Sequence, residues 1–154
     1  MLNSWKKVNL ASLIPQTMAD KTTYHFELEM KVRDYEVDYE GIVNNAVYLN
    51  YMEHTRHEFC ENAGLSFASM HESGIDPVLR RAEVDYIHPL RSGDRFISCL
   101  KMTREGARFI FVQAIYRLPD HQQILRARIT VASLEHGKVG RGDALAEVFA
   151  DYLK

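Results

Sequence analysis

The sequence predicts an α+β fold in which one long helix packs against a mostly antiparallel sheet. A helical pattern of apolar residues begins near residue 45 and continues for roughly 20 residues, and stretches rich in Val, Ile, Phe and Tyr surround it. Short turns separate the last three of these stretches, which is typical of a meander. One helix can cover so many strands only if the sheet curls, so we expect a curved antiparallel sheet wrapped around one long central helix.

An alternation of period two predicts the first strand. Apolar side chains occupy every second position, so one face of this strand should be buried: Tyr24, Phe26, Leu28, Met30 and Val32. After the strand, Gly41 lets the chain turn at a φ that other residues rarely adopt. Asn44 or Asn45 can then cap a helix by accepting one of its unpartnered N–H groups.

The predicted central helix follows this cap directly. Its apolar residues recur at helical spacing and form one face long enough to cross a whole sheet: Tyr48, Tyr51, Met52, Thr55, Phe59 and Ala63. Gly64 stands where a C-terminal cap is expected. Glu53 and Arg56 lie one helical turn apart, and we interpret them as a structural salt bridge rather than a catalytic pair.

Beyond the helix, most of the chain is predicted to form strands. Residues 66–72 form a short helix or a loop that ends at Gly74, and residues 77–87 are extended. Three clearer strands follow: Arg95–Thr103, Arg108–Arg117 and Gln123–Glu135. Residues 136–142 are rich in turn formers, and Asp143 can cap a final helix that continues to Leu153.

Composition is that of one ordinary globular domain. The 154 residues are 46% hydrophobic and 26% charged, with a net charge of −2. We expect a single domain over residues 22–154 and an N-terminal extension of uncertain status over residues 1–21, in which Met18 is an alternative start. Scattered Lys and Arg residues argue against nucleic-acid binding. No apolar run suits a membrane span or a secretory signal, so a cytoplasmic location is expected.

Neither a metal nor another cofactor is expected. Cys60 and Cys99 fit no disulfide framework and no Cys-x-x-Cys motif, so we predict that both are reduced core residues. His54, His57 and Glu58 superficially resemble metal ligands, but no further ligand is marked and the order His-Glu-x-x-His is missing. The absence of a Gly-x-Ser-x-Gly motif excludes an α/β-hydrolase.

The most informative stretch leads a carboxylate through the Gly41 turn to the start of the helix. Asp38 is this carboxylate, although Asp is also common in turns without any function. Glu36 and Glu40 flank it, and we interpret both as surface charges. The helix start offers free N–H groups and the positive end of the helix dipole, which could polarise an acyl carbonyl.

The same stretch resembles a known family. The order Asp-x-x-Gly-Ile-Val-x-x-x-x-Tyr from Asp38 to Tyr48, and the hairpin from Pro89 to Asp94, resemble hotdog-fold acyl thioesterases of the 4-hydroxybenzoyl-CoA thioesterase type. The Val-Asn-Asn turn at residues 43–45 is most similar to acyl-ACP thioesterases, and the likeness extends from residue 22 to 134. It implies a hotdog fold whose open sheet edges pair in a homodimer or homotetramer.

The resemblance also implies hydrolysis of acyl-CoA or acyl-ACP thioesters to the free acid and a thiol. Asp38 would act as nucleophile or general base, and the N–H of Asn45 or Ala46 would bind the oxyanion. The phosphates of CoA would need a surface cation near the site, and Arg91 is favoured among five candidates: Arg80, Arg81, Arg91, Arg104 and Arg108. The expected substrate-binding residues lie in the turn, the helix and the hairpin: Gly41, Val43, Asn44, Ala46, Tyr48, Met52 and Arg91.

One departure limits what this resemblance transfers. Plastid acyl-ACP thioesterases of plants carry Asn and His two and four positions after the Asp, where this chain has Glu40 and Ile42. Only the role of Asp38 is therefore carried over. Two alternatives stay open: a hotdog dehydratase or hydratase, whose His is missing around Asp38, and a noncatalytic acyl-binding module, which sequence alone does not separate from an enzyme.

Overall fold

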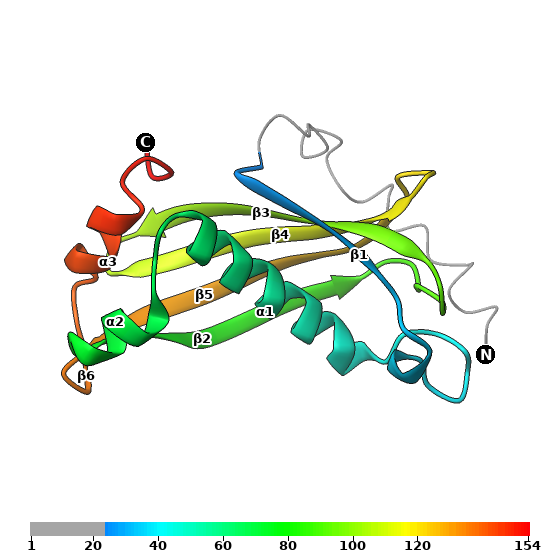
Figure 1. The fold of residues 1–154 in the computed structure, drawn as a ribbon, viewed down its shortest axis with the longest axis horizontal. Helices are drawn as coiled ribbons and strands as arrows, with labels where there is room; N and C mark the ends of the chain where they lie inside the picture. The colour runs from blue at the N-terminus through cyan, green and yellow to red at the C-terminus, as the bar shows by residue number, and fades with distance from the viewer. Residues whose placement is uncertain (1–23) are drawn as a thin grey trace.

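A six-stranded antiparallel sheet curls around one long helix in the computed structural model, which describes residues 24–154 (Figure 1). The predicted N-terminal extension, with Met18, lies outside the described residues. The main strands follow the order β1-β3-β4-β5-β2, and β6 pairs with β5. This arrangement confirms the predicted α+β class and the curved sheet. The strands are β1 (Phe26–Lys31), β2 (Ile75–Tyr86), β3 (Arg95–Glu105), β4 (Arg108–Leu118), β5 (Gln123–Glu135) and β6 (Lys138–Val139).

The central helix α1 (Asn45–Asn62) lies across the concave face of the sheet (Figure 1). Of the two predicted N-caps, Asn44 is the one used, and Gly64 adopts a φ of +81° just beyond the helix end. The predicted apolar face is buried except for Ala63, which is half-buried: Tyr48, Tyr51, Met52, Thr55 and Phe59. Burying this face against the strands is the main stabilisation of a helix in water.

Three polar contacts fix α1 on the sheet. Thr55 donates to the hydroxyl oxygen of Ser98 on β3 at 2.7 Å. On β4, Gln113 accepts a hydrogen bond from the Arg56 guanidinium at 2.8 Å and donates one to the Met52 carbonyl at 3.1 Å. A buried polar group is costly unless it is hydrogen-bonded. These bonds therefore fix the position of α1 along the sheet.

Strand β2 forms one edge of the main sheet and contains most of the segment that was predicted to be extended. It pairs with β5 on one side, and its register shifts between Leu79 and Arg81. Pro77 lacks an N–H, which an edge strand tolerates. Within the described residues no strand pairs with the other side of β2, so a row of its backbone groups is left open.

Two short helices lie at the end of the sheet opposite the start of α1 (Figure 1). They are α2 (Phe67–Glu72) and α3 (Asp143–Val148). The prediction for the last helix was wrong in two respects, because its N-cap is Gly142 rather than Asp143 and it ends at Val148 rather than Leu153. The Asp143 carboxylate instead pairs with the Arg104 guanidinium at 2.7 Å.

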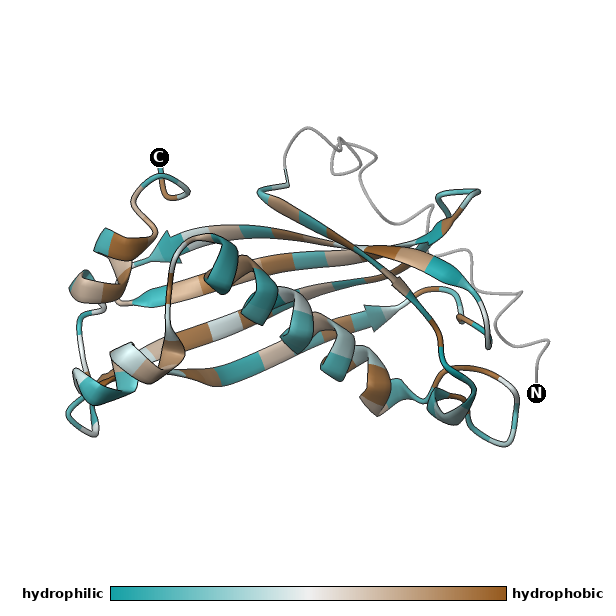
Figure 2. Ribbon diagram, in the orientation of Figure 1, coloured by the Kyte–Doolittle hydropathy of each residue, from teal (hydrophilic) through white to brown (hydrophobic). Residues whose placement is uncertain are grey.

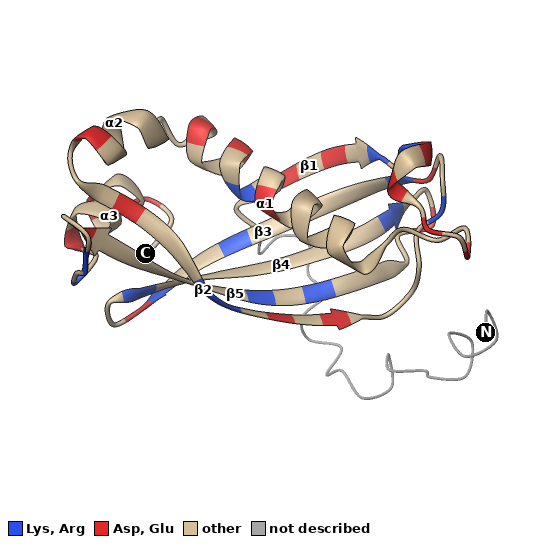
Figure 3. Ribbon diagram, turned by 90° about the horizontal axis from the view of Figure 1, so that it is seen from below, with Lys and Arg blue, Asp and Glu red and all other residues tan. Residues whose placement is uncertain are grey.

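Apolar side chains concentrate between α1 and the sheet, whereas the solvent side of α1 is mostly polar (Figure 2). Both cysteines are buried core residues, as predicted. Opposite charges pair across strands β5, β2 and β3 (Figure 3): Arg126 lies 2.8 Å from Asp85, and Arg128 lies 2.7 Å from Glu105. None of the helices in residues 24–154 is both long and apolar enough to cross a membrane.

Candidate active site

The predicted site residues Asp38, Gly41 and Val43 lie on a small hairpin between the 3₁₀-helix η4 (Asp34–Glu36) and α1. The Asp38 N–H donates to the Ile42 carbonyl at 2.8 Å, and Val37 pairs with Val43 across the hairpin. Gly41 has a φ of +76°, which side chains disfavour, so the glycine is required for this turn. One short piece of chain therefore carries both the carboxylate and the helix start, as the sequence indicated.

The turn holds one oxygen of the Asp38 carboxylate. Oδ1 accepts the Glu40 N–H at 2.8 Å, and in the part of the chain that the structure describes Oδ2 has no hydrogen-bond partner. The side chain is half-buried. A carboxylate that is fixed through one oxygen and free at the other suits a general base or a nucleophile equally well.

The start of α1 has a backbone donor without a partner. The Asn44 side-chain oxygen accepts the Ala46 N–H at 2.9 Å, and the Asn44 carbonyl accepts the Val47 N–H at 2.9 Å. Between them, the Asn45 N–H makes no hydrogen bond within residues 24–154. Of the two oxyanion donors that the sequence left open, Asn45 is therefore the available one. The Tyr86 hydroxyl donates to the Asn45 carbonyl at 3.0 Å and anchors this turn.

The connection between β2 and β3 packs against the hairpin. The Val43 N–H donates to the Leu90 carbonyl, and the Leu90 N–H donates to the Tyr48 hydroxyl, both at 2.9 Å. Burial raises the pKa of Tyr48 to about 12, so its hydroxyl stays neutral. Arg91 directly follows Leu90, and its exposed guanidinium has no polar partner among the described residues. A cation near the hairpin is thus available for a ligand.

Glu36 was expected to be a surface charge, and that interpretation was wrong. Only 8% of the residue is exposed. Its carboxylate accepts hydrogen bonds from the Tyr51 hydroxyl on α1 and from both the backbone N–H and the guanidinium of Arg33. Burial by itself would raise the pKa of Glu36, but these hydrogen bonds hold it below its ordinary value. The buried carboxylate therefore ties η4, and the hairpin that follows, to α1.

A cavity of about 110 Å³ lies beside the C-terminal half of α1, away from the hairpin. Val43, Tyr48 and Met52, which were expected to contact substrate, do not line it, and all three are buried in the core. No pattern in the sequence predicts this cavity. Its lining comprises Glu53, Arg56, His57, Cys60, Leu65, Phe67, Met70, Pro77, Leu79, Met102, Phe109, Phe111, Val131, Leu145 and Phe149.

The salt bridge expected between Glu53 and Arg56 is not formed. Glu53 lies 4.0 Å from the imidazole of His57, while the Arg56 guanidinium binds the neutral side chain of Gln113. Burial lowers the pKa of Arg56, and the Glu53 charge acts in the opposite direction. Residues 24–154 contain no group of three or more His, Cys, Asp or Glu side chains placed to hold a metal ion.

Two curated relatives come from Arabidopsis thaliana. The acyl-acyl carrier protein thioesterase ATL3, chloroplastic, is 42% identical over 103 residues, which are 66% of this chain and 54% of the relative. Its counterpart ATL2, also chloroplastic, is 40% identical over 111 residues, which are 71% of this chain and 59% of the relative. The chain thus spans little more than half the length of these relatives.

Solved structures share the fold, and a family model covers most of the chain. The probable thioesterase YbaW from Escherichia coli is 28% identical and has a TM-score of 0.75 over 84% of this chain and 100% of its own. The 1,4-dihydroxy-2-naphthoyl-CoA thioesterase Slr0204 from Synechocystis has the same TM-score at 21% identity, over 82% of this chain and 96% of its own. The model of the thioesterase-like superfamily matches residues 32–153. The chain therefore belongs to the thioesterase-like superfamily and has its hotdog fold.

Proposed function

We propose that this protein hydrolyses acyl thioesters of CoA or acyl carrier protein, with Asp38 as general base or nucleophile and the Asn45 N–H as oxyanion donor. The observation that carries the proposal is the Asn45 N–H at the start of an 18-residue helix, which has no hydrogen-bond partner within residues 24–154. The helix dipole favours a negative oxygen at this position. The same hairpin presents the free oxygen of Asp38, and the family relationship supports thioester chemistry.

In the general-base route, a water oxygen attacks the thioester carbon while Asp38 takes one of the water protons. The carbonyl π electrons move to oxygen, and the Asn45 N–H stabilises the oxyanion that results. The carbonyl then re-forms, the C–S bond breaks, and the thiolate leaves and takes up the proton. In the nucleophilic route, an Asp38 oxygen bonds to the acyl carbon and expels the thiolate, and water then hydrolyses the anhydride.

Two further features of the structure support the proposed substrates and the proposed assembly of the subunits. The Arg91 guanidinium, which no other described residue pairs with, suits the phosphate groups that CoA and acyl carrier protein carry, because Arg binds phosphate through several N–H groups. The open edge of β2 supports pairing of two copies in a homodimer or homotetramer. Hydrolysis by these residues needs no cofactor. A cytoplasmic location remains a prediction, and the Arabidopsis relatives are named chloroplastic.

Thiol release from a panel of acyl-CoA and acyl-ACP thioesters tests the proposal, with short, long, β-keto and aromatic acyl groups. Asp38→Asn should lower kcat by a hundredfold or more on the best substrate, because it removes the proton acceptor. Glu40→Gln is the matched control on the same turn, since only the backbone N–H of Glu40 binds Asp38. It should keep kcat within about twofold of the wild-type value.

Wild-type protein that releases no thiol from any member of the panel would contradict the enzyme proposal and favour a noncatalytic acyl-binding module. Equal rates for wild type and Asp38→Asn would contradict the role of Asp38 alone. Label found in the Asp38 carboxylate after a single turnover in ¹⁸O-labelled water would identify the nucleophilic route, since label enters there only if an anhydride forms and is attacked at the aspartyl carbon.

A further inference from the structure

The cavity beside α1 has a polar opening and an apolar interior. Glu53 and His57 are exposed and Arg56 is half-buried, so these three side chains mark the opening. The remaining lining residues carry no charge. An apolar cavity of about 150 Å³ can hold benzene, so by proportion about 110 Å³ holds roughly four carbon atoms. This space suits the end of an alkyl chain better than a polar ligand.

One flank of α1 connects the helix start with this cavity. Asn45, Leu49 and Glu53 recur every four residues, so they lie on the same side of the helix. Strand β2 runs along this side, because Tyr86 bonds to the Asn45 carbonyl at one end and Leu79 lines the cavity at the other. Leu49 is 41% exposed between the two sites and Leu79 is 53% exposed at the cavity, so apolar side chains stay uncovered along this path.

The length of this path defines a class of acyl chain. Glu53 and Cys60 line the cavity and follow Asn45 by 8 and 15 residues along α1. At a rise of 1.5 Å per residue, the cavity lies about 12–22 Å from the oxyanion donor. An extended chain advances about 1.2 Å per bond, so this span corresponds to roughly 10–18 carbons. Acyl chains shorter than this end before the cavity.

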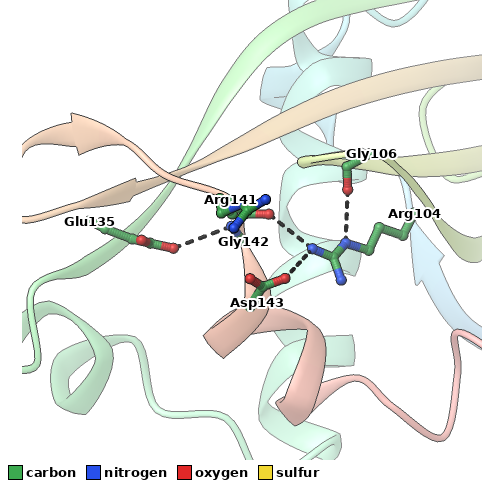
Figure 4. Close-up of polar contacts among 6 residues, drawn as sticks. All are labelled: Arg104, Gly106, Glu135, Arg141, Gly142 and Asp143. Atoms are coloured by element: carbon green, nitrogen blue, oxygen red, sulfur yellow. Dashed lines mark hydrogen bonds and ion pairs between the residues drawn. The ribbon is translucent and has the colours of Figure 1, made fainter.

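Helix α3 forms one wall of the cavity through Leu145, together with Phe149 just beyond its C-terminal end. Polar contacts of Arg104 hold its first turn in place (Figure 4): the guanidinium donates to the Gly106 carbonyl at 2.9 Å, to the Arg141 carbonyl at 2.9 Å and to the Asp143 carboxylate at 2.7 Å. The contacts of Arg104 lie on the surface. The side chains of Leu145 and Phe149, which these contacts position, face the interior.

Phe109 adds a second constraint on this wall. A Cβ atom at Gly142 would approach the Phe109 ring to 2.8 Å, and Gly142 has a φ of +77°. The chain therefore enters α3 in close contact with β4, which leaves α3 little freedom to retreat from the cavity.

We propose that this cavity binds the terminal carbons of a medium- or long-chain acyl group, and that Leu145 on α3 limits the length of chain accepted. The inference rests on the proposed thioesterase function, because the thioester is placed at Asn45. It assigns chain-length selection to a helix at the far end of the sheet from Asp38.

Variants at Leu145 test this assignment, with kcat/KM measured for acyl-CoA thioesters of 4 to 18 carbons. Leu145→Trp should fill the cavity and lower kcat/KM at least tenfold for chains of roughly 12 carbons or more, while chains of 4 to 6 carbons change less than about twofold. Leu145→Ala should move the optimum to longer chains. Val148→Trp is the matched control, because Val148 lies on the same helix, is 43% exposed and does not line the cavity.

A second variant and a binding measurement keep the test decisive. Cys60→Phe fills the same cavity from α1 and replaces Leu145→Trp if that protein fails to fold. The thermal shift produced by dodecanoate reports occupancy without catalysis, and both filling variants should abolish it. A uniform loss over all chain lengths, or an unchanged length profile, would overturn the inference. A third possible result is that wild type releases no thiol but still binds dodecanoate, with only the two filling variants losing that binding. This result would refute the proposed thioester hydrolysis and retain the cavity assignment.

Discussion

The Asn44 side chain accepts the Ala46 N–H at 2.9 Å, and the residue between the two keeps its own N–H unpartnered within the described chain. An N-cap normally stabilises a helix by pairing its early donors. Here the pairing also selects which donor remains, because Ala46 is occupied and Asn45 is not. The cap thus has both a structural and a proposed catalytic consequence.

Replacing Asn44 by Ala should separate these two consequences. Loss of the cap should lower the free energy of unfolding by about 1 kcal/mol. It should also lower kcat for thioester hydrolysis by about tenfold, because the first turn of α1 no longer holds the Asn45 N–H in one orientation. Chemical denaturation and steady-state kinetics on the same preparation measure both effects.

Asn44→Ser is the control for this prediction, since Ser is also a favoured N-cap. It should restore most of the stability and most of kcat together. A large loss of kcat in Asn44→Ser with full stability would show that the Asn44 amide has a direct role that the geometry of the cap does not explain.

Glu36 predicts a specific pH dependence of stability. Its pKa is lower in the folded protein than the ordinary value of 4.5, so the folded state favours the charged carboxylate. The stabilisation is therefore present above pH 4.5 and is lost as the pH falls through the folded pKa. Glu36→Gln should remove about 2 kcal/mol at neutral pH, because hydrogen bonds from Arg33 and Tyr51 lose their charged acceptor.

Urea unfolding between pH 3 and pH 7 measures this effect as a difference between wild type and variant. The difference should shrink as the pH falls below 4.5. Glu40→Gln, which alters a neighbouring carboxylate outside this network, should track wild type over the whole range. A constant difference between wild type and Glu36→Gln would mean that the native carboxylate is not preferentially ionised.

Local pattern in the sequence was sufficient for most of the fold. The residues that recur from Tyr48 to Phe59 predicted the buried face of α1, because burial of that face depends on helical spacing alone. The turn at Gly41 and a cap at Asn44 or Asn45 were also predicted from local chemistry, and Asn44 is the cap that is used. The last helix was placed less well, because a distant residue, Arg104, takes the Asp143 side chain that the local pattern assigned as a cap.

Contacts between residues far apart in sequence account for what was not predicted. Glu36 is buried where the Tyr51 side chain of α1 packs against it and donates a hydrogen bond to its carboxylate. The sequence around either residue gives no indication of this pairing. Likewise, Arg56 has a carboxylate one turn away but binds Gln113 on β4, 57 residues later. Residues from α1, α2, α3 and the sheet line the cavity together, so no local pattern in the sequence indicates it.

The pairing of Arg56 with Gln113 predicts an unusual pattern of mutant stabilities. Gln113→Leu should cost about 2 kcal/mol or more, because the half-buried guanidinium then lacks its acceptor and the Met52 carbonyl lacks its donor. Arg56→Met should cost less, since a methionine side chain fills the space without a charge. The double variant should be more stable than the sum of the two single changes predicts, by about 1 kcal/mol.

Free energies of unfolding for the four proteins give this coupling directly. Val112→Leu is a suitable control on β4, because this half-buried neighbour of Gln113 belongs to the opposite face of the strand. It should show no coupling with Arg56→Met. Simple additivity of Gln113→Leu and Arg56→Met would mean that the two side chains stabilise the protein independently.

Cys60 should be an unreactive thiol in the native protein. Burial raises its pKa to about 12, and the nearby Arg56 charge opposes this only in part. The thiolate fraction at pH 8 is therefore very small, and alkylating reagents need the thiolate. Cys99 is 1% exposed and should be protected by burial.

Iodoacetamide should label neither cysteine in the native protein and both in 6 M guanidinium chloride, while native protein kept in the reagent should retain its thioesterase activity. Rapid native labelling of Cys60 would show that burial does not suppress ionisation of its thiol, whereas loss of activity in step with labelling would point to a cysteine in the reaction.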